Sequence, residues 1–415
     1  MTGIAYEDFL DRDYEPADDE LVCTFRVRPA AGLDVDAAAG RIASESSNGT
    51  WTELEVPGEV TALSATAFDV DGDEVRIAYP PELFEPGNMA QVLSCIAGNI
   101  LGMKAVERIR LLDCAWPAEI AAGFPGPQFG TAVREEFFDA GDRPITATVP
   151  KPKVGLSTEQ HARVGYEAWV GGVDLLKDDE NLTGQSFNPF EERLTASLDR
   201  RDAAEDETGE EKSYLVNVTA ETRTMLERAD AVAAHGGEYV MVDVVTAGWS
   251  ALQSVRERCE DLGLAIHAHR AMHAAFDRIA DHGVSMRCLA QFARLCGVDH
   301  IHTGTAGLGK MENEDTVGIN EWLYDDLHGL RDVLPVASGG LHPGVVPALL
   351  ERVGTNVCIQ AGGGIHGHPD GTRAGAAALR ASIEAAMAGV PLQERAADVP
   401  ELAAALETWG TDAPR

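Results

Sequence analysis

The segment from Val173 to Asn181 combines residue types that could bind a metal ion. An apolar run, V-D-L-L, leads into Lys177, and acidic side chains follow at Asp179 and Glu180. A buried lysine ammonium is costly, so it must be paired, lose its proton or be modified. One interpretation is a structural lysine–carboxylate cluster. The other is a neutral amine that reacts with carbon dioxide to give a carbamate, completing the all-oxygen ligand set that Mg²⁺ prefers.

Two glycine-rich stretches are candidates for phosphate binding. They are Ser338-Gly339-Gly340 and Ala361-Gly362-Gly363-Gly364, and each follows a short apolar run. Backbone N–H groups of such stretches can bind phosphate, although a tight turn without a ligand is the alternative. Arg270 and His302 follow two other apolar runs and could form a second anion site. Two anion sites at one mouth would imply a bisphosphate substrate.

A further glycine-rich segment, H-T-G-T-A-G-L-G-K-M-E, runs from His302 to Glu312. Its glycines would allow it to swing, so we expect a lid that brings the ammonium of Lys310 over a bound substrate and excludes water. A flexible surface loop without this role is the alternative.

The candidate residues follow short apolar runs that alternate with amphipathic helical stretches. Eight strand-then-helix units predict a (β/α)8 barrel, in which residues at the carboxyl ends of the strands converge on one mouth. Polar residues, Lys151, Lys153 and His269 among them, follow nearly every run, so we expect one shared site. The runs are Ile145 to Val149, Val173 to Leu176, Tyr214 to Val218, Tyr239 to Val245, Ala265 to His269, His300 to His302, Leu334 to Ala337 and Val357 to Gln360.

The preceding part of the chain has a different pattern. Strand-like stretches at Leu21 to Arg28 and Val75 to Tyr79 alternate with helical stretches at Val35 to Ser44 and Met89 to Leu101. This mixture predicts a small α+β domain. The length of 415 residues accommodates such a domain beside a barrel of roughly 250 residues. We expect an N-terminal α+β domain over residues 1–143 and a barrel with C-terminal helices over residues 144–415.

The charge of the chain is strongly negative, with 68 acidic and 33 basic side chains and a formal net charge of -35. This balance argues against broad binding to nucleic acids or anionic membranes. It is also typical of proteins adapted to molar salt, where charges are screened beyond roughly 3 Å, so we expect a halophilic source.

The seven cysteines occur singly, without the spacing of a zinc site. We expect them to be reduced and mostly buried. The first twenty residues are acidic rather than basic and apolar, and no apolar run approaches the length of a membrane span. We therefore expect a cytoplasmic protein.

Several motifs, in this order along the chain, resemble the large subunit of ribulose-1,5-bisphosphate carboxylase/oxygenase (RuBisCO), whose N-terminal α+β domain is of the ferredoxin-like type. The short ends and the motif sequences are similar to the archaeal form III enzyme. That form works without small subunits and uses ribulose bisphosphate derived from nucleotides, in AMP salvage, rather than from photosynthesis. The motifs are E-S-S-N-G-T-W (45–51), G-N-I-L-G-M-K-A (98–105), K-P-K-V-G-L-S (151–157), G-G-V-D-L-L-K-D-D-E-N (171–181), H-A-H-R-A-M-H (267–273), H-T-G-T (302–305), the lid ending in Lys310, S-G-G-L-H (338–342) and G-G-G (362–364).

The resemblance implies a lyase that carboxylates ribulose 1,5-bisphosphate to two molecules of 3-phosphoglycerate, with an oxygenase side reaction. It implies Mg²⁺ bound by carbamylated Lys177 and by the carboxylates of Asp179 and Glu180, with carbon dioxide as the activator. The implied catalytic residues are Lys151, which moves protons on the enediolate and the product carbanion; Lys153, which supports it; His269, which assists the hydrated intermediate; and Lys310, which stabilises the new carboxylate.

The resemblance also implies the substrate-binding residues and a second subunit. Glu45 and Asn99 would come from the partner chain, so the smallest active unit is a homodimer, and a higher assembly of dimers is open. The phosphate-binding residues implied are Thr50, Trp51, Gly339, Gly340, Gln360, Gly362 and Gly363 on one side, and Arg270, His302 and Ser338 on the other.

Two departures from the family pattern leave questions open. Thr148 lies three residues before Lys151, whereas the pattern places a threonine two residues before that lysine, so the role of Thr148 is open. The stretch from Met311 to Leu334 is shorter than its family counterpart. The competing functions are a RuBisCO-like enolase or isomerase, which should lack parts of the lid and phosphate set, and a noncatalytic barrel for assembly, which should lack ligands at the mouth.

Overall fold

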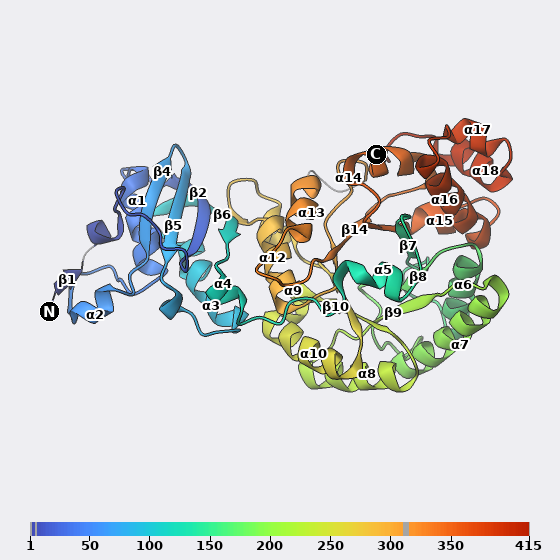
Figure 1. Ribbon diagram of the computed structural model, residues 1–415, viewed down its shortest axis with the longest axis horizontal. Helices are drawn as coiled ribbons and strands as arrows, with labels where there is room; N and C mark the ends of the chain where they lie inside the picture. The colour runs from blue at the N-terminus through green and yellow to red at the C-terminus, as the bar shows by residue number, and fades with distance from the viewer. Residues whose placement is uncertain (1, 5, 310–314, 415) are drawn as a thin grey trace. The chain divides into compact units, whose positions relative to one another are not determined.

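The computed structural model describes residues 2–4, 6–309 and 315–414, and it divides into two compact units (Figure 1). We call them the N-terminal unit and the barrel unit. The predicted domain boundary between residues 143 and 144 stays a prediction, because a division by contacts does not test which segments fold independently. The N-terminal unit comprises Met1–Gly126, Met272–Cys296 and Asp326–Leu330, and the barrel unit comprises Pro127–Ala271, Gly297–Asp325 and Arg331–Arg415.

The barrel unit contains a closed sheet of eight parallel strands, which confirms the predicted (β/α)8 barrel. Each strand pairs with the next one along the chain within the barrel, and the last pairs with the first. The strand ends differ from the predicted ends by no more than two residues. The strands are β7 (Ile145–Thr148), β8 (Leu175–Lys177), β9 (Ser213–Asn217), β10 (Tyr239–Asp243), β11 (Ala265–His269), β13 (His300–His302), β14 (Leu334–Ser338) and β15 (Cys358–Gln360).

The barrel strands are apolar because both of their faces are buried, as is usual for parallel sheets. All five residues of β10, Y-V-M-V-D, are buried. Inside the barrel, Leu175, Leu215 and Tyr239 pack in one apolar cluster. Phe137 packs edge-on against Tyr239 with 5.2 Å between ring centroids, which fills the end of the barrel opposite the mouth.

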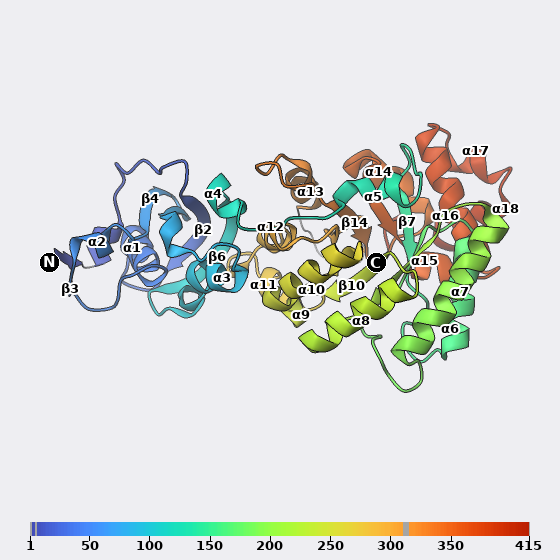
Figure 2. The ribbon, with the colours of Figure 1, turned by 60° about the horizontal axis from the view of Figure 1, so that its bottom comes forward.

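Helices surround the barrel and bury their apolar faces against it (Figures 1 and 2). Ile359 on β15 packs with Leu379 and Ile383 of α16 in one cluster, and each such side chain contributes roughly 1.5–3 kcal/mol when fully buried. Figure 2 shows α17 and α18 close to α16. The longer helices are α6 (Thr158–Val170), α7 (Phe190–Thr208), α8 (Thr222–Ala234), α10 (Trp249–Leu262), α13 (Thr316–Tyr324), α14 (Val346–Val353), α16 (Thr372–Met387) and α18 (Pro400–Trp409), with the shorter α15 (Gly363–His366) and α17 (Leu392–Ala396).

The N-terminal unit is built on a five-stranded sheet of order β12-β6-β2-β5-β4, which confirms the predicted α+β class. Buried and more exposed residues alternate along β2, as expected for a sheet with one face in a core. The elements are β1 (Thr2–Ile4), β2 (Leu21–Pro29), α1 (Val35–Glu45), β3 (Leu54–Val56), β4 (Thr66–Asp71), β5 (Glu74–Tyr79), α3 (Met89–Ile96), β6 (Val106–Ala115), β12 (Gly283–Val284) and α12 (Met286–Cys296).

The helix predicted from Met89 to Leu101 is shorter in the structure. It ends at Ile96, and a separate 3-10 turn covers Asn99–Gly102. Gly98 explains the break, because glycine is a poor helix former and a Cβ at this position would lie 2.1 Å from the carbonyl oxygen of Ser94.

The cysteines are free, and all are buried except the half-buried Cys95, as the sequence predicted. Within the described ranges, no helix has both the length and the apolar character needed to cross a bilayer.

Candidate active site

The carboxyl ends of the barrel strands surround a cavity of about 400 Å³. Trp409 and Pro414, near the end of the chain, also line it, although no pattern in the sequence indicated this. The structure therefore brings most of the predicted site into one cavity within one unit. The predicted residues that line it are Lys151, Asp179, Glu180, His269, Ser338, Gly339, Gly340, Gln360, Gly362 and Gly363.

Lys177, the last residue of β8, is completely buried. Its Nζ donates a hydrogen bond to the backbone carbonyl of Asp178 over 2.7 Å. Burial lowers the pKa of its ammonium group below the usual 10.5, although nearby carboxylates, Glu180 first among them, act in the opposite direction. Burial therefore makes the unprotonated amine easier to form at this position than on an exposed lysine.

The two predicted carboxylate ligands lie beside Lys177. Asp179 Oδ2 is 3.1 Å from Lys151 Nζ. Burial alone would raise the pKa of Asp179, but hydrogen bonds from Asn181 and the charge of Lys151 lower it. Glu180 Oε2 lies 3.6 Å from Nε2 of His269. Both carboxylates are therefore available at the cavity, as a hard cation requires.

The residues present fit a magnesium site only if Lys177 is modified. Among the described residues, no group of three or more histidine, cysteine, aspartate or glutamate side chains is arranged to hold a metal ion. Asp179 and Glu180 supply two carboxylates, and a neutral buried amine beside them is the chemical form that can react with carbon dioxide. A carbamate on Lys177 would supply the missing oxygen ligand.

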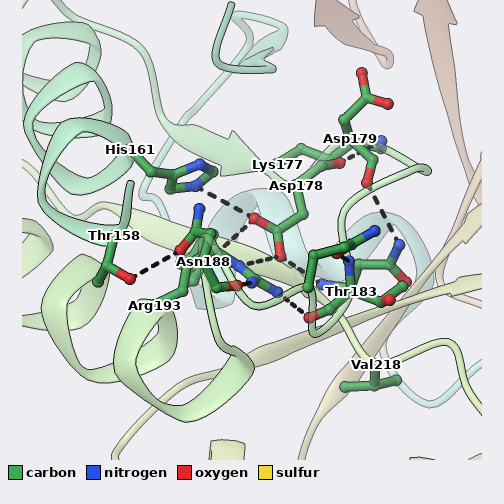
Figure 3. A network of polar contacts seen from close by, with 12 residues as sticks. Thr158, His161, Lys177, Asp178, Asp179, Thr183, Asn188, Arg193 and Val218 are labelled. Atoms are coloured by element: carbon green, nitrogen blue, oxygen red, sulfur yellow. Dashed lines mark hydrogen bonds and ion pairs between the residues drawn. The ribbon is translucent and has the colours of Figure 1, made fainter. Parts of the chain in front are cut away.

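Asp178 lies between the predicted ligands, and its carboxylate points toward His161 and Arg193, away from the carboxylate of Asp179 (Figure 3). Tyr214 donates a hydrogen bond to Oδ1 over 2.6 Å, and the backbone N–H of Asn217 donates to Oδ2 over 3.0 Å. Arg193 Nε lies 3.1 Å from Oδ2. Burial alone would raise the pKa of Asp178, but Arg193, His161 at 3.3 Å and the hydrogen bond from Tyr214 lower it to about 2.

Arg193 extends this network to the loop after β8. Its guanidinium donates to the backbone carbonyls of Asn188 over 2.8 Å and of Thr183 over 2.6 Å. Holding Asp178 against Tyr214 and Arg193 fixes the backbone between Lys177 and Asp179, whose side chains are the predicted ligands. Asp178 was not among the residues predicted from the sequence, because its partner Arg193 lies on a separate helix.

His269 is held by Asp243, its partner in register on the neighbouring strand β10. The Nδ1–H of His269 donates to Asp243 Oδ1 over 2.8 Å. Burial lowers the pKa of His269, although Asp243 and Glu180 raise it, so a neutral imidazole is favoured. Its Nε2 is the nitrogen on the side of Glu180.

His302 and Ser338 form the centre of the predicted second anion site. His302 Nδ1 lies 2.6 Å from Ser338 Oγ, and His302 Nε2 lies 2.8 Å from Nε2 of His267. Burial, with the charge of neighbouring histidines, lowers the pKa of His302 well below its usual value. Arg270, also buried, is therefore the cationic member of this set.

The glycine turns are required by the backbone itself. Gly339 and Gly340 have φ values of +114° and +97°, which side chains of L-residues rarely adopt. A Cβ on Gly364 would lie 2.2 Å from the carbonyl oxygen of Leu341, whereas a Cβ on Gly363 would have open space around it. The turn after β15 is thus packed on one side and open on the other.

The remaining predicted residues lie elsewhere. Lys153 is exposed on the loop after β7. Glu45 and Asn99 belong to the N-terminal unit, where Asn99 Nδ2 donates to Glu45 Oε1 over 3.4 Å beside a cavity of about 520 Å³. Thr50 and Trp51 belong to the same unit, and Trp51 is 81% exposed. Lys310 lies outside the described residues.

The fold and the cavity define a class of protein: a (β/α)8-barrel enzyme that handles an anionic substrate beside a buried lysine and two carboxylates. The chain belongs to the ribulose bisphosphate carboxylase large chain family. The family's catalytic domain matches residues 130–409, and its N-terminal domain matches residues 8–120.

Archaeal relatives are similar over the full length. A curated relative named ribulose bisphosphate carboxylase from Pyrococcus abyssi is 53% identical, covering 99% of this chain and 98% of that protein. The crystal structure of an octameric RuBisCO with sulfate ion from Pyrococcus horikoshii has a TM-score of 0.95 at 52% identity, covering 99% of this chain and 98% of that one. A dimeric archaeal RuBisCO from Hyperthermus butylicus has a TM-score of 0.91 at 45% identity, covering 98% and 99%.

Proposed function

We propose that the chain carboxylates ribulose 1,5-bisphosphate with carbon dioxide and water to two molecules of 3-phosphoglycerate, with oxygenation as a side reaction. The observation that carries this proposal is the complete burial of Lys177 at the end of β8, next to the carboxylates of Asp179 and Glu180. The names of the full-length archaeal relatives support it. The geometry gives no comparable support to a noncatalytic barrel, because the charged groups meet in one cavity.

The proposed cofactor is Mg²⁺, held by Asp179, Glu180 and a carbamate on Lys177. The neutral Nζ attacks the carbon of carbon dioxide, an N–C bond forms and one proton leaves, so that Lys177 becomes an anionic oxygen ligand. When bound, Mg²⁺ stabilises negative charge on enediolate oxygens. Burial of Lys177 supports this activation, because it lowers the pKa of the ammonium group and only the unprotonated amine is nucleophilic.

Lys151 is the proposed proton-transfer group, since it lines the cavity 3.1 Å from Asp179. In this proposal it moves protons on the enediolate and later protonates the product carbanion, and Lys153 supports it by hydrogen bonding. Carbon 2 of the enediolate attacks carbon dioxide, and His269 assists the hydrated intermediate that precedes carbon–carbon cleavage. Lys310 would stabilise the new carboxylate.

The two phosphates are proposed to bind on opposite sides of the cavity. The glycine turns after β14 and β15, with Gln360, would bind one phosphate together with Thr50 and Trp51. Arg270, His302 and Ser338 would bind the other. We further propose a homodimer in which Glu45 and Asn99 of one subunit complete the active site in the barrel of the other. The proposal also allows higher assemblies of such dimers. The dimeric and octameric assembly of the archaeal structures supports a homo-oligomer.

The decisive experiment incubates the purified protein with labelled bicarbonate, Mg²⁺ and ribulose 1,5-bisphosphate in high KCl. We expect label in 3-phosphoglycerate. Its absence from a folded, oligomeric preparation would contradict carboxylation. Conversion of a phosphorylated sugar without incorporation of label would instead favour the enolase or isomerase alternative.

A further inference from the structure

Thr148, whose role the sequence left open, has two hydrogen-bond partners. It is the last residue of β7 and is completely buried. Its Oγ1 lies 2.6 Å from the carbonyl oxygen of Ala361 and 2.9 Å from Nε2 of His366. Ala361 directly precedes the glycine turn Gly362–Gly364, and His366 ends α15, which begins within that turn. One hydroxyl group therefore holds both ends of this turn against β7.

The partners fix the direction of each hydrogen bond. A hydroxyl group has one proton, and the carbonyl of Ala361 can only accept, so Thr148 donates to Ala361. Thr148 must then accept from the Nε2–H of His366. The Nδ1 of His366 is left without a proton and accepts from the hydroxyl of Thr372, which lies 3.0 Å away at the start of α16. A neutral imidazole with its proton on Nε2 thus matches the hydrogen-bonding needs of both threonine hydroxyls.

The electrostatic surroundings agree with a neutral imidazole. Burial, with a smaller effect from the charge of Lys151, lowers the pKa of His366 to about 4. His366 is therefore neutral over the pH range in which enzymes are usually assayed, and its hydrogen bonds do not change through titration there. The role of His366 is to donate one hydrogen bond in one direction.

The hydrogen bonds of Thr148 also bring the glycine turn close to Lys151. Thr148 lies three residues before Lys151, and a Cβ on Gly362 would be 3.1 Å from Cε of that lysine. The backbone of the turn and the side chain of Lys151 are thus in close contact inside the same cavity. A displacement of the turn of about 1 Å would change both the anion-binding groups and the environment of the lysine, which is enough to reduce activity strongly.

We propose that Thr148, His366 and Thr372 are positioning residues that hold the turn Gly362–Gly364 in the geometry needed to bind a phosphate group of the substrate beside Lys151. This inference rests on the proposed function of the turn. It assigns a role to the unusual spacing of Thr148 and to a histidine that touches no substrate.

The test compares matched substitutions in the full-length enzyme. Thr148→Val keeps the shape of the side chain and removes the hydroxyl group, whereas Thr148→Ser keeps the hydroxyl group. His366→Met removes the ring nitrogens, whereas His366→Gln retains a donor near the position of Nε2. We expect Thr148→Val and His366→Met to raise KM for ribulose 1,5-bisphosphate about tenfold with a smaller change in kcat, as for loss of ground-state binding. The conservative variants should stay within about threefold of the wild type.

Two further measurements separate positioning from a loss of stability. Inhibition by inorganic phosphate should weaken in parallel with the rise in KM, while the Mg²⁺ and carbon dioxide concentrations needed for activation stay unchanged. The KM of the double variant Thr148→Val/His366→Met should be no higher than that of the more affected single variant, because both substitutions interrupt the same series of hydrogen bonds. If the Thr148 variant fails to fold, Thr372→Val tests the half-exposed end of the same chain and should give a smaller rise in KM.

The outcomes distinguish this inference from the proposed function. An unchanged KM in folded variants, or a fall in kcat alone, would overturn the positioning role. If the wild-type enzyme does not carboxylate, the proposed function fails, but calorimetric binding of inorganic phosphate to the same variants still decides whether the chain positions the turn. Equal phosphate affinity in Thr148→Val and wild type would refute it.

Discussion

The carboxylate of Asp178 and the guanidinium of Arg193 form an ion pair of 3.1 Å in which neither side chain is exposed to solvent. Asp178 lies between Lys177 and Asp179, so the pair anchors the segment at the end of β8 that carries the predicted metal ligands. Removing one partner leaves an uncompensated buried charge, at a cost of about 3–5 kcal/mol. The predicted metal-binding segment therefore depends on a helix residue that does not line the cavity.

Arg193→Met should lower the free energy of unfolding by about 3–5 kcal/mol. Denaturant unfolding at fixed protein and salt concentration would measure this. The matched control is Arg200→Met, because Arg200 lies on the same helix but is exposed, and a surface substitution should change stability by less than about 0.5 kcal/mol. Equal stability of the two variants would show that the buried pair does not anchor β8.

The barrel and its mouth could be predicted from the sequence because both depend on local patterns. Short apolar runs such as Ala265 to His269 identify strands, and parallel strands bring their carboxyl ends together whatever the intervening helices are. The same reasoning predicts a single shared site for Lys177, His269 and Ser338, since each of them stands at the end of such a run.

Contacts between distant segments could not be predicted in this way. The pairing of Asp178 with Arg193 depends on how α7 packs outside the barrel, and the bond between Thr148 and His366 depends on closure of β15 on β7. Trp409 reaches the cavity only through the packing of α18 on α16. The repeating pattern of apolar residues along a strand or helix does not determine these long-range contacts. They can be inferred from a sequence only through its resemblance to a known family.

Lys177→Met should abolish activation by carbon dioxide while the barrel remains folded. Methionine fills a similar volume without an amine, so it can neither form a carbamate nor leave a buried polar group. Calorimetry would show Mg²⁺ binding that increases with bicarbonate in the wild type but not in the variant. Lys212→Met is the control, because Lys212 is also buried but pairs with Glu210 rather than with the predicted ligands. Bicarbonate-dependent Mg²⁺ binding in Lys177→Met would exclude the carbamate.

Gly363→Ala should weaken substrate binding, whereas Gly364→Ala should lower the stability of the protein. A Cβ on Gly363 meets no protein atom within 4 Å but enters the space proposed for a phosphate, so KM should rise roughly tenfold without loss of stability. A Cβ on Gly364 would collide with the carbonyl of Leu341 at 2.2 Å, so unfolding should become easier. Thermal unfolding and steady-state kinetics on both variants would separate these effects. A normal KM in Gly363→Ala would place the phosphate elsewhere.

The stability of the barrel should depend on the ionisation of Asp174. Its carboxylate is buried, accepts two hydrogen bonds of 2.8 Å from Arg143 and another of 2.7 Å from the backbone N–H of Thr146. Burial alone would raise the pKa of Asp174, but Arg143 lowers it below the usual 3.8. The native state therefore binds this proton less readily than the unfolded state, and the unfolded state gains it first as the pH falls.

The stabilisation from Asp174 is thus fully present above the unfolded pKa of about 4 and is lost as the pH falls through the lower native pKa. Asp174→Asn should be less stable than the wild type at pH 7, and the difference should shrink as the pH falls below about 4. Denaturant midpoints of both proteins at constant salt would measure it, and the comparison cancels the titration of the other acidic residues. A difference that stays constant or grows as the pH falls would mean that Arg143 does not hold Asp174 in its charged form.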